Sequence, residues 1–225
     1  LQRALIEKTG HDNGFEHVLP AVGDAVTLAS ARHRSYAVVT PLAGDLEVRL
    51  QPASPALVPE LLRSFKLWAG ADGVFRVPTL ADLATLLRRA ASLSQALPNQ
   101  AVRDYHTAVA QVLADLPAEN RGTEVERLVR QRVGQDRYRD ALLNYWGGAC
   151  AVTGVTVTEV LRASHAKPWA ECTDDAERLD AFNGFLLVAN LDALFDRFLI
   201  SFDDAGHLLT SARLSPDDLH GLGIH

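Results

Sequence analysis

Three side chains in the C-terminal part of the chain have the types and spacing that hydrolysis of a phosphodiester requires. His165 ends an apolar segment and can take a proton from water. Asn183 opens a second such segment and can fix the geometry between the other two side chains. Asp192 follows on a helical segment, where its carboxylate can hold a hard divalent cation. The spacing therefore predicts a small metal-assisted phosphodiesterase site.

The elements that must position these residues follow from the apolar pattern around them. A long helix is expected from Thr123 to about Trp146, because residues 123–126 fit a capping box and Gly147 and Gly148 stop it. Downstream we expect a strand and turn at 149–154, a return towards His165 over 155–163, a strand at 184–189, a helix at 191–195, and a hairpin of 199–202 with 207–210 across the turn 203–206.

The N-terminal part has a different, mixed pattern. Strands rich in β-branched residues are expected at 25–29, 36–40 and 46–50, paired antiparallel, and helices at 1–8, 56–68, 80–93 and 101–116. Thr79 is the expected N-cap of the third of these helices. The polar, turn-rich stretch Pro117–Gly122 is the candidate boundary. The prediction is an α+β protein with a mixed strand and helix domain over 1–117 and a second domain over 123–225.

Composition restricts the class of protein. The chain has 225 residues, 48% of them hydrophobic, which suits a sizeable core. No apolar run reaches the ~18 residues of a membrane helix, and no signal peptide is visible at the N-terminus, so a cytoplasmic protein with no membrane partner is expected. Cys150 and Cys172 belong to no CxxC pair, and we expect neither a structural zinc nor a disulfide.

Charge is distributed unevenly along the chain. The net charge of −6 argues against non-specific coating of nucleic acid, but it does not exclude a local basic groove. One segment, 121–139, carries six arginines against Glu124, Glu126 and Asp136. Two interpretations stay open for it: phosphate contacts through Arg130 and Arg137, or an ordinary helix surface with i,i+4 pairs such as Glu126 with Arg130.

The combined pattern resembles the HNH (ββα-metal) nuclease family, in particular a bacterial subgroup found among restriction endonucleases and their relatives. The resemblance covers roughly residues 126–209, and the pieces that carry it are Arg137–Leu143, Cys150–Gly154, Ala163–His165, Lys167–Trp169, Glu177–Asp180, Asn183 with Gly184, Leu194–Asp196 and Leu199–Phe202. It implies a C-terminal ββα-metal nuclease domain that acts on DNA.

The resemblance also implies roles for single residues. His165 matches the first histidine of the family, the general base, and Asn183 matches the middle position. Asp192 stands where the family places its last histidine, and a carboxylate there favours Mg²⁺ or Mn²⁺ as the cofactor. Asp196, four residues further on, is a second ligand or a hydrogen-bonding and capping residue.

Ser164 departs from the family pattern, which often has an acidic residue or a histidine as a further metal ligand at this position. Serine is a poor ligand, so the metal would be held by Asp192, phosphate oxygens and water. Lys167 is the cation nearest the motif and the candidate for a phosphate contact.

Two functional hypotheses follow. The first is a metal-dependent DNA endonuclease in restriction or defence, whose N-terminal part recognises DNA, a modified base or a partner protein. The second is a DNA-binding or regulatory protein on an HNH scaffold that has lost catalysis, which Ser164 and Asp192 motivate. An N-terminal oligomerisation module, and with it a homodimer, is a further alternative.

Overall fold

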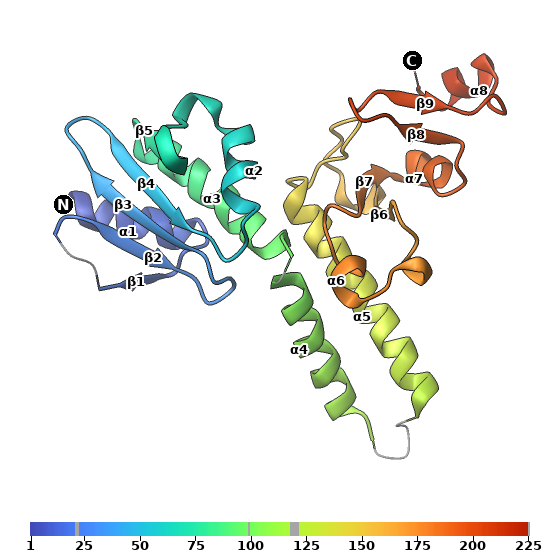
Figure 1. The fold of residues 1–225 in the computed structure, drawn as a ribbon, viewed down its shortest axis with the longest axis horizontal. Helices are drawn as coiled ribbons and strands as arrows, with labels where there is room; N and C mark the ends of the chain where they lie inside the picture. Colours follow the sequence, from blue (N-terminus) through green and yellow to red (C-terminus); the bar gives the residue numbers. More distant parts are fainter. Residues whose placement is uncertain (21–22, 99, 118–121, 225) are drawn as a thin grey trace. The chain divides into compact units, whose positions relative to one another are not determined.

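The computed structural model describes residues 1–20, 23–98, 100–117 and 122–224, which form two compact units, Leu1–Arg137 and Tyr138–His225 (Figure 1). The division falls inside a long helix, α5 (Thr123–Tyr145). Residues 118–121 of the expected boundary lie outside the described residues. The predicted α+β class is confirmed.

The N-terminal unit is built on a five-stranded antiparallel meander. The strands are β1 (His17–Leu19), β2 (Val26–Ala29), β3 (Tyr36–Pro41), β4 (Leu46–Gln51) and β5 (Val74–Val77), in that spatial order. Alternate residues of β4 are buried, as expected for a sheet with one covered face. The three expected strands and their antiparallel pairing are therefore confirmed.

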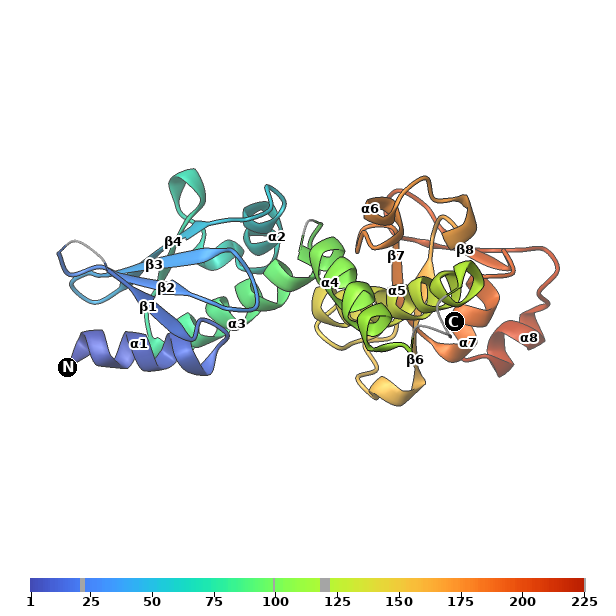
Figure 2. The same ribbon diagram turned by 90° about the horizontal axis from the view of Figure 1, so that it is seen from below.

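Helices cover the buried face of this sheet. Helix α1 (Gln2–Asp12) and helix α3 (Leu80–Ala96) contact each other and lie on the same side of the sheet (Figure 2), with α2 (Leu57–Ser64) packed on α3. The predicted cap is present, because the Thr79 hydroxyl accepts a hydrogen bond from the Asp82 N–H at 3.1 Å. Helix α4 (Gln100–Asp115) follows α3.

The C-terminal unit is a ββα arrangement with a terminal hairpin. Strand β6 (Leu161–His165) pairs antiparallel with β7 (Gly184–Val188), and α7 (Ala189–Phe195) contacts both strands. Between β6 and β7 lies a loop with a 3₁₀ turn at Trp169–Glu171 and the one-turn helix α6 (Asp175–Arg178). Strands β8 (Ile200–Phe202) and β9 (Leu208–Thr210) form the predicted hairpin, and α8 (Pro216–Gly221) follows.

Several sequence predictions need correction. Residues 149–154 form a turn and no strand, because the Cys150 N–H bonds the Val155 carbonyl and the Gly154 N–H bonds the Cys150 carbonyl. Thr123 is the first residue of α5 and not its cap. Helix α1 extends four residues beyond the predicted end at residue 8, and α2 ends at Ser64, four residues before the predicted end. Strands β1 and β5 and helices α6 and α8 were not predicted.

The described residues contain no helix with both the length and the apolarity that a membrane span requires. Cys150 and Cys172 are both buried free thiols.

Candidate active site

The site is built on the register of β6 and β7. His165, the last residue of β6, pairs with Gly184, the first residue of β7, and Ser164 pairs with Phe185. The two strands approach very closely here: a Cβ on Gly184 would overlap both the Tyr138 hydroxyl and the Ser164 carbonyl oxygen. Glycine is therefore required at position 184 for close approach of the backbones.

The His165 ring is held so that one nitrogen is a donor and the other is available as a base. Its Nε2 lies 2.9 Å from the carbonyl oxygen of Arg178. A carbonyl only accepts, so in the neutral imidazole Nε2 carries the proton and Nδ1 keeps its lone pair. Burial lowers the pKa of His165, which the Arg178 carbonyl and the charge of Asp196 oppose in part. The neutral, basic form of the ring is therefore favoured near pH 7.

The Tyr138 side chain, from α5, stacks against the His165 ring. The two rings stack with centroids 3.7 Å apart and an interplanar angle of 19°. The Tyr138 hydroxyl donates to the Asn183 carbonyl at 2.9 Å, and burial raises the pKa of Tyr138, so the hydroxyl stays protonated. One side chain thus fixes both the plane of the His165 imidazole and the start of β7.

The acceptor of His165 is itself braced. The Arg178 guanidinium donates to the carbonyl oxygens of Trp169 at 3.3 Å and Cys172 at 2.8 Å, and it pairs with Asp175 at 3.0 Å. It also lies over the Trp169 ring, 5.7 Å from its centroid. These contacts tie the β6–β7 loop together and fix the carbonyl that selects the His165 tautomer.

Asn183 closes the same loop from the other end. Its Oδ1 accepts from the Lys167 N–H at 2.9 Å, and its Nδ2 donates to the Glu177 carbonyl at 3.1 Å. Its backbone carbonyl accepts from the Ala166 N–H at 2.9 Å. The structure therefore places Asn183 as a brace that holds the segment after His165.

Two carboxylates stand four residues apart, Asp192 in α7 and Asp196 at the C-cap of this helix. The hydroxyl of Ser164, which is 2% exposed, donates to the Asp192 carboxylate. Asp196 is one helical turn further on, and its charge acts on His165. Burial and the neighbouring charge of Asp192 raise the pKa of Asp196. Two like charges held close together is an arrangement that a bound cation would relieve.

Two of the side chains are of the type that binds a hard divalent cation. Asp192 and Asp196 would hold it, because both offer carboxylate oxygens of the kind that Mg²⁺ and Mn²⁺ prefer. Within the described residues, no three His, Cys, Asp or Glu side chains gather into a set that could hold a metal ion. The two carboxylates therefore supply part of a coordination shell, and water and phosphate oxygens would supply the rest.

The three cations predicted to contact substrate are placed differently. The Lys167 ammonium lies 2.6 Å from Glu177 Oε1, and this hydrogen bond, with others from Thr173, lowers the pKa of Glu177 to about 2. Arg130 bonds Glu126 at 2.7 Å, which is the ion pair of the helix-surface interpretation. Arg130 and Arg137 fall in the N-terminal unit, and their contact with phosphate stays a prediction.

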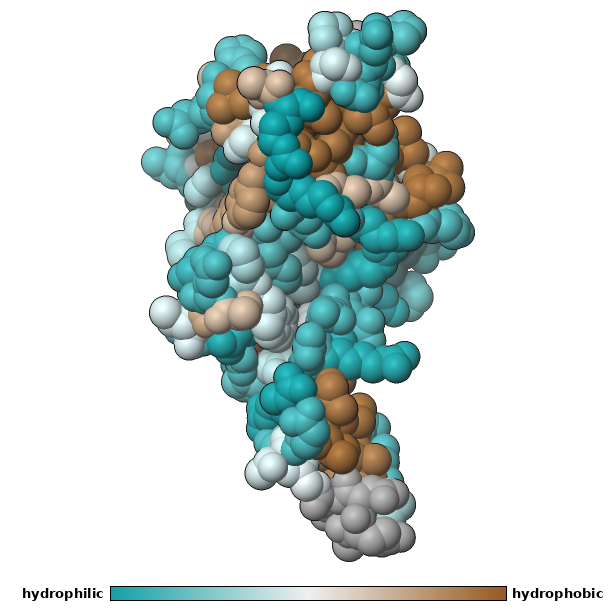
Figure 3. Space-filling view, turned by 90° about the vertical axis from the view of Figure 1, so that its right-hand side faces the viewer, coloured by the Kyte–Doolittle hydropathy of each residue, from teal (hydrophilic) through white to brown (hydrophobic). Residues whose placement is uncertain are grey.

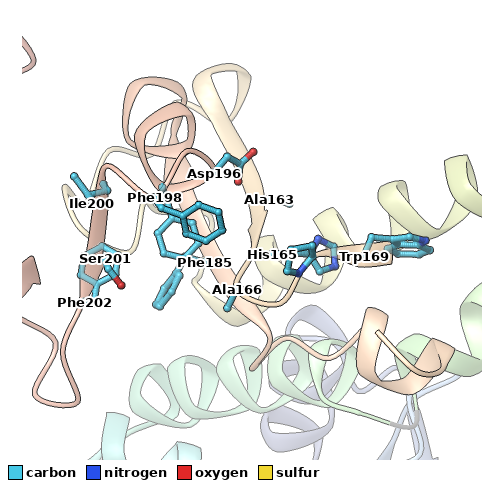
Figure 4. Close-up of a pocket in the computed structure, with 12 residues that line it drawn as sticks. Ala163, His165, Ala166, Trp169, Phe185, Asp196, Phe198, Ile200, Ser201 and Phe202 are labelled. Carbon is cyan, nitrogen blue, oxygen red and sulfur yellow. The ribbon is translucent and has the colours of Figure 1, made fainter. Parts of the chain in front are cut away.

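A cavity of about 610 Å³ opens beside His165. Figure 4 shows His165 between Trp169 on one side and Phe185, Phe198 and Phe202 on the other, and Asp196 also lines the cavity. The lining also includes Phe195. The candidate base therefore faces a hollow large enough for a small-molecule group.

The HNH endonuclease family model matches residues 150–203, the segment that contains β6, β7, α7 and β8. This segment of the chain is thus similar to HNH endonucleases, and the resemblance to the HNH family seen in the sequence is confirmed for it. The match includes Ser164, His165, Lys167, Asn183 and Asp192 and leaves Arg130, Arg137 and Tyr138 outside. No curated protein matches the chain.

Tyr138 and Arg178 stand in the motif pieces 137–143 and 177–180, but the sequence did not predict their contacts with His165. One contributes a ring face and the other a backbone carbonyl, which residue type does not reveal. For Asp196 the spacing of four residues from Asp192 was the available signal.

Proposed function

We propose that this protein is a metal-dependent DNA endonuclease and that its biological role is restriction or defence. The match to the HNH endonuclease family model supports phosphodiester hydrolysis as the reaction class. The observation that carries the proposal is the orientation of His165: its Nε2–H is committed to the Arg178 carbonyl, and the ring lines a cavity that Asp196 also lines.

The residues of the chain then have the following tasks. His165 Nδ1 accepts a proton from a water molecule, the resulting hydroxide forms a bond to phosphorus, and the bond to the 3′ oxygen breaks, with a proton supplied by solvent. Tyr138 and Asn183 keep the ring and its loop in place. The cation, held by Asp192 and Asp196, would stabilise negative charge on the phosphate and the departing oxygen.

Lys167 has a conditional role in this scheme. Its ammonium is paired with Glu177, and the Lys167 side chain is 40% exposed, so a phosphate could replace the carboxylate as its partner. Such a contact would add a salt-dependent contribution to affinity.

The test is nicking of supercoiled plasmid and phage DNA, with and without base modifications, in Mg²⁺, Mn²⁺, Ni²⁺ and Zn²⁺. We expect His165→Ala and His165→Gln to lose about 10²- to 10⁴-fold in rate. Glutamine keeps an N–H donor that can reach the Arg178 carbonyl, so this variant removes the base with the least change in packing. His207→Gln is the matched control, because His207 is an exposed histidine beside Asp203 in the β8–β9 turn. Wild-type rates in both His165 variants would refute the mechanism.

A second candidate function is DNA binding without cleavage. It is favoured by Ser164, whose hydroxyl is used to hold Asp192 and whose position in many family members carries a metal ligand. Retained DNA binding with no metal-dependent nicking in the wild-type protein would establish this second function in place of the first.

A further inference from the structure

We propose that the cavity beside His165 holds an unpaired base of the DNA strand being cut, and that Phe198 is the residue on which this base stacks. The proposal rests on the proposed nuclease function and adds a substrate class: DNA with an unpaired or single-stranded nucleotide at the scissile position.

The cavity wall is aromatic. Phe185 packs edge-on against Phe195, with centroids 5.5 Å apart, and lies 5.1 Å from Phe202. These three rings form a mutually packed group between β7, α7 and β8. A volume of about 610 Å³ is within the range of pockets that enclose small ligands.

Phe198 lines the same cavity but belongs to no such packed group. The residue is 81% exposed, and within the described residues its ring has no aromatic contact. Figure 3 shows apolar residues gathered on the surface of the C-terminal unit at the level of α7 and β8. An exposed phenylalanine next to an aromatic cavity extends its apolar surface outwards.

The backbone conformation at position 198 also disfavours a large side chain, so the stability of the fold does not account for a phenylalanine there. The Leu199 N–H bonds the Leu194 carbonyl and the Phe198 N–H bonds the Phe195 carbonyl, both at 2.9 Å. This is the Schellman ending of α7, in which the residue at position 198 is left-handed, with φ of 55°. Glycine is the favoured residue there, and a bulky side chain is strained.

Phe198 therefore carries a strained backbone and an exposed ring, and the fold gains little packing from either. Strained residues of this kind cluster at active sites and ligand-binding sites. A planar ring with one free face is suited to stacking against another planar ring.

A nucleobase is the planar group that the chemistry of the site brings here. His165 and Asp196 lie on the same cavity as Phe198, so a phosphate presented to His165 has its own nucleotide within reach of the phenylalanines. In a regular duplex both faces of a base are covered by its neighbours. The cavity can therefore accept a base only if that base is unpaired or turned out of the stack.

The test compares three oligonucleotides of one sequence: a complete duplex, the duplex with one unpaired 2-aminopurine, and the single strand. Binding to the full-length protein is measured by fluorescence anisotropy in Ca²⁺. For the wild type we expect tighter binding of the two unpaired forms and quenching of 2-aminopurine on binding. Stacking on one aromatic side chain predicts a preference of roughly 5- to 150-fold.

Substitutions at Phe198 separate stacking from folding. Glycine adopts the left-handed backbone at position 198 without strain, so the Tm of Phe198→Gly should equal or exceed that of the wild type, to within a few degrees. The same variant should lose most of the preference for unpaired DNA and most of the 2-aminopurine quenching. Phe198→Trp should retain both and Phe198→Leu should lose both. Phe182→Leu makes the same change at another exposed phenylalanine, outside the cavity, and should bind as the wild type does.

Equal binding of paired and unpaired DNA by the wild type would overturn the proposal. Wild-type preference and quenching in Phe198→Leu would also overturn it, and would indicate that the site takes an apolar group of another kind. The nuclease function fails independently. If the wild type binds unpaired DNA through Phe198 but cuts none of the oligonucleotides in Mg²⁺ or Mn²⁺, the stacking site stands and the proposed reaction does not.

Discussion

Gly184→Ala is the substitution that tests the architecture of the site most directly. The added Cβ would lie closer than 3.0 Å to two groups, the Tyr138 hydroxyl and the Ser164 carbonyl oxygen. Neither can turn away easily, since one belongs to a buried ring stacked on His165 and the other to the backbone of β6. Strands β6 and β7 must therefore separate, or Tyr138 must leave its place.

The expected cost is at the upper end of what one extra methyl group causes in a packed interior, about 3 kcal/mol. For a unit of the size of the C-terminal one, this corresponds to a decrease in Tm of about 10–20 °C. Because His165 is paired directly with residue 184, a displacement on the order of 1 Å would also lower the cleavage rate by about 100-fold.

The assay is thermal unfolding by circular dichroism together with the plasmid nicking rate. Gly221→Ala in α8 is the matched control, because its Cβ meets nothing within 4 Å, and it should be neutral or slightly stabilising. Adding Tyr138→Phe to Gly184→Ala removes one of the two overlaps and should restore part of the stability, measured as a coupling energy in a double-mutant cycle. A Gly184→Ala protein that unfolds at the wild-type temperature would refute the close approach of β6 and β7.

Three further predictions concern metal, salt and pH. In calorimetric titrations, Asp192→Ala should bind Mn²⁺ more weakly than the wild type, and Asp192→His should shift the metal preference towards softer metals. Unchanged Mn²⁺ affinity in Asp192→Ala would remove this carboxylate from the site. Reversing the charges of Arg130 and Arg137 together should flatten the plot of log K for DNA binding against log salt concentration. The slope should change by roughly one to two units, because each lost phosphate contact removes about 0.9. An unchanged slope would show that both are ordinary helix-surface residues. Burial lowers the pKa of His33, so this side chain binds a proton more readily in the unfolded chain than in the folded one. The contribution of neutral His33 to the free energy of unfolding should therefore be complete above about pH 6.5 and should be lost as the pH falls through the folded-state pKa. Denaturant titrations should show a smaller pH dependence in His33→Gln, and an equal one would assign it to other groups.

Local patterns in the sequence were sufficient for the elements that carry the site. The strong turn at residues 203–206 predicted the β8–β9 hairpin. The sequence also predicted that His165 ends a strand and that Asp192 lies on a helix, and Asn183 directly precedes β7. These features depend on neighbours within a few residues, which a sequence displays directly. The match to the HNH endonuclease family model falls on the same part of the chain, residues 150–203.

Elements whose residues lack a local signal were not found. Strands β1 and β5 are short, and sheet pairing decides them: β1 is stabilised as a strand by its ladder with β2, and β5 by its ladder with β4. The segment 149–154 contains β-branched residues but folds as a turn, because Gly154 adopts a left-handed backbone with φ of 71°. Tertiary context thus overrode propensity in both directions.

By itself the sequence predicted which residues could carry acid–base and ligand chemistry and on or beside which kinds of element they stand. Only the tertiary structure decided how they act together: the Arg178 carbonyl that fixes the His165 tautomer, the Tyr138 ring beneath it, and Asp196 and Phe198 on the same cavity. These contacts join segments that are far apart in the chain, and they depend on backbone atoms, ring faces and strained conformations. Residue type does not encode such features, because they arise only when the strands and helices have packed.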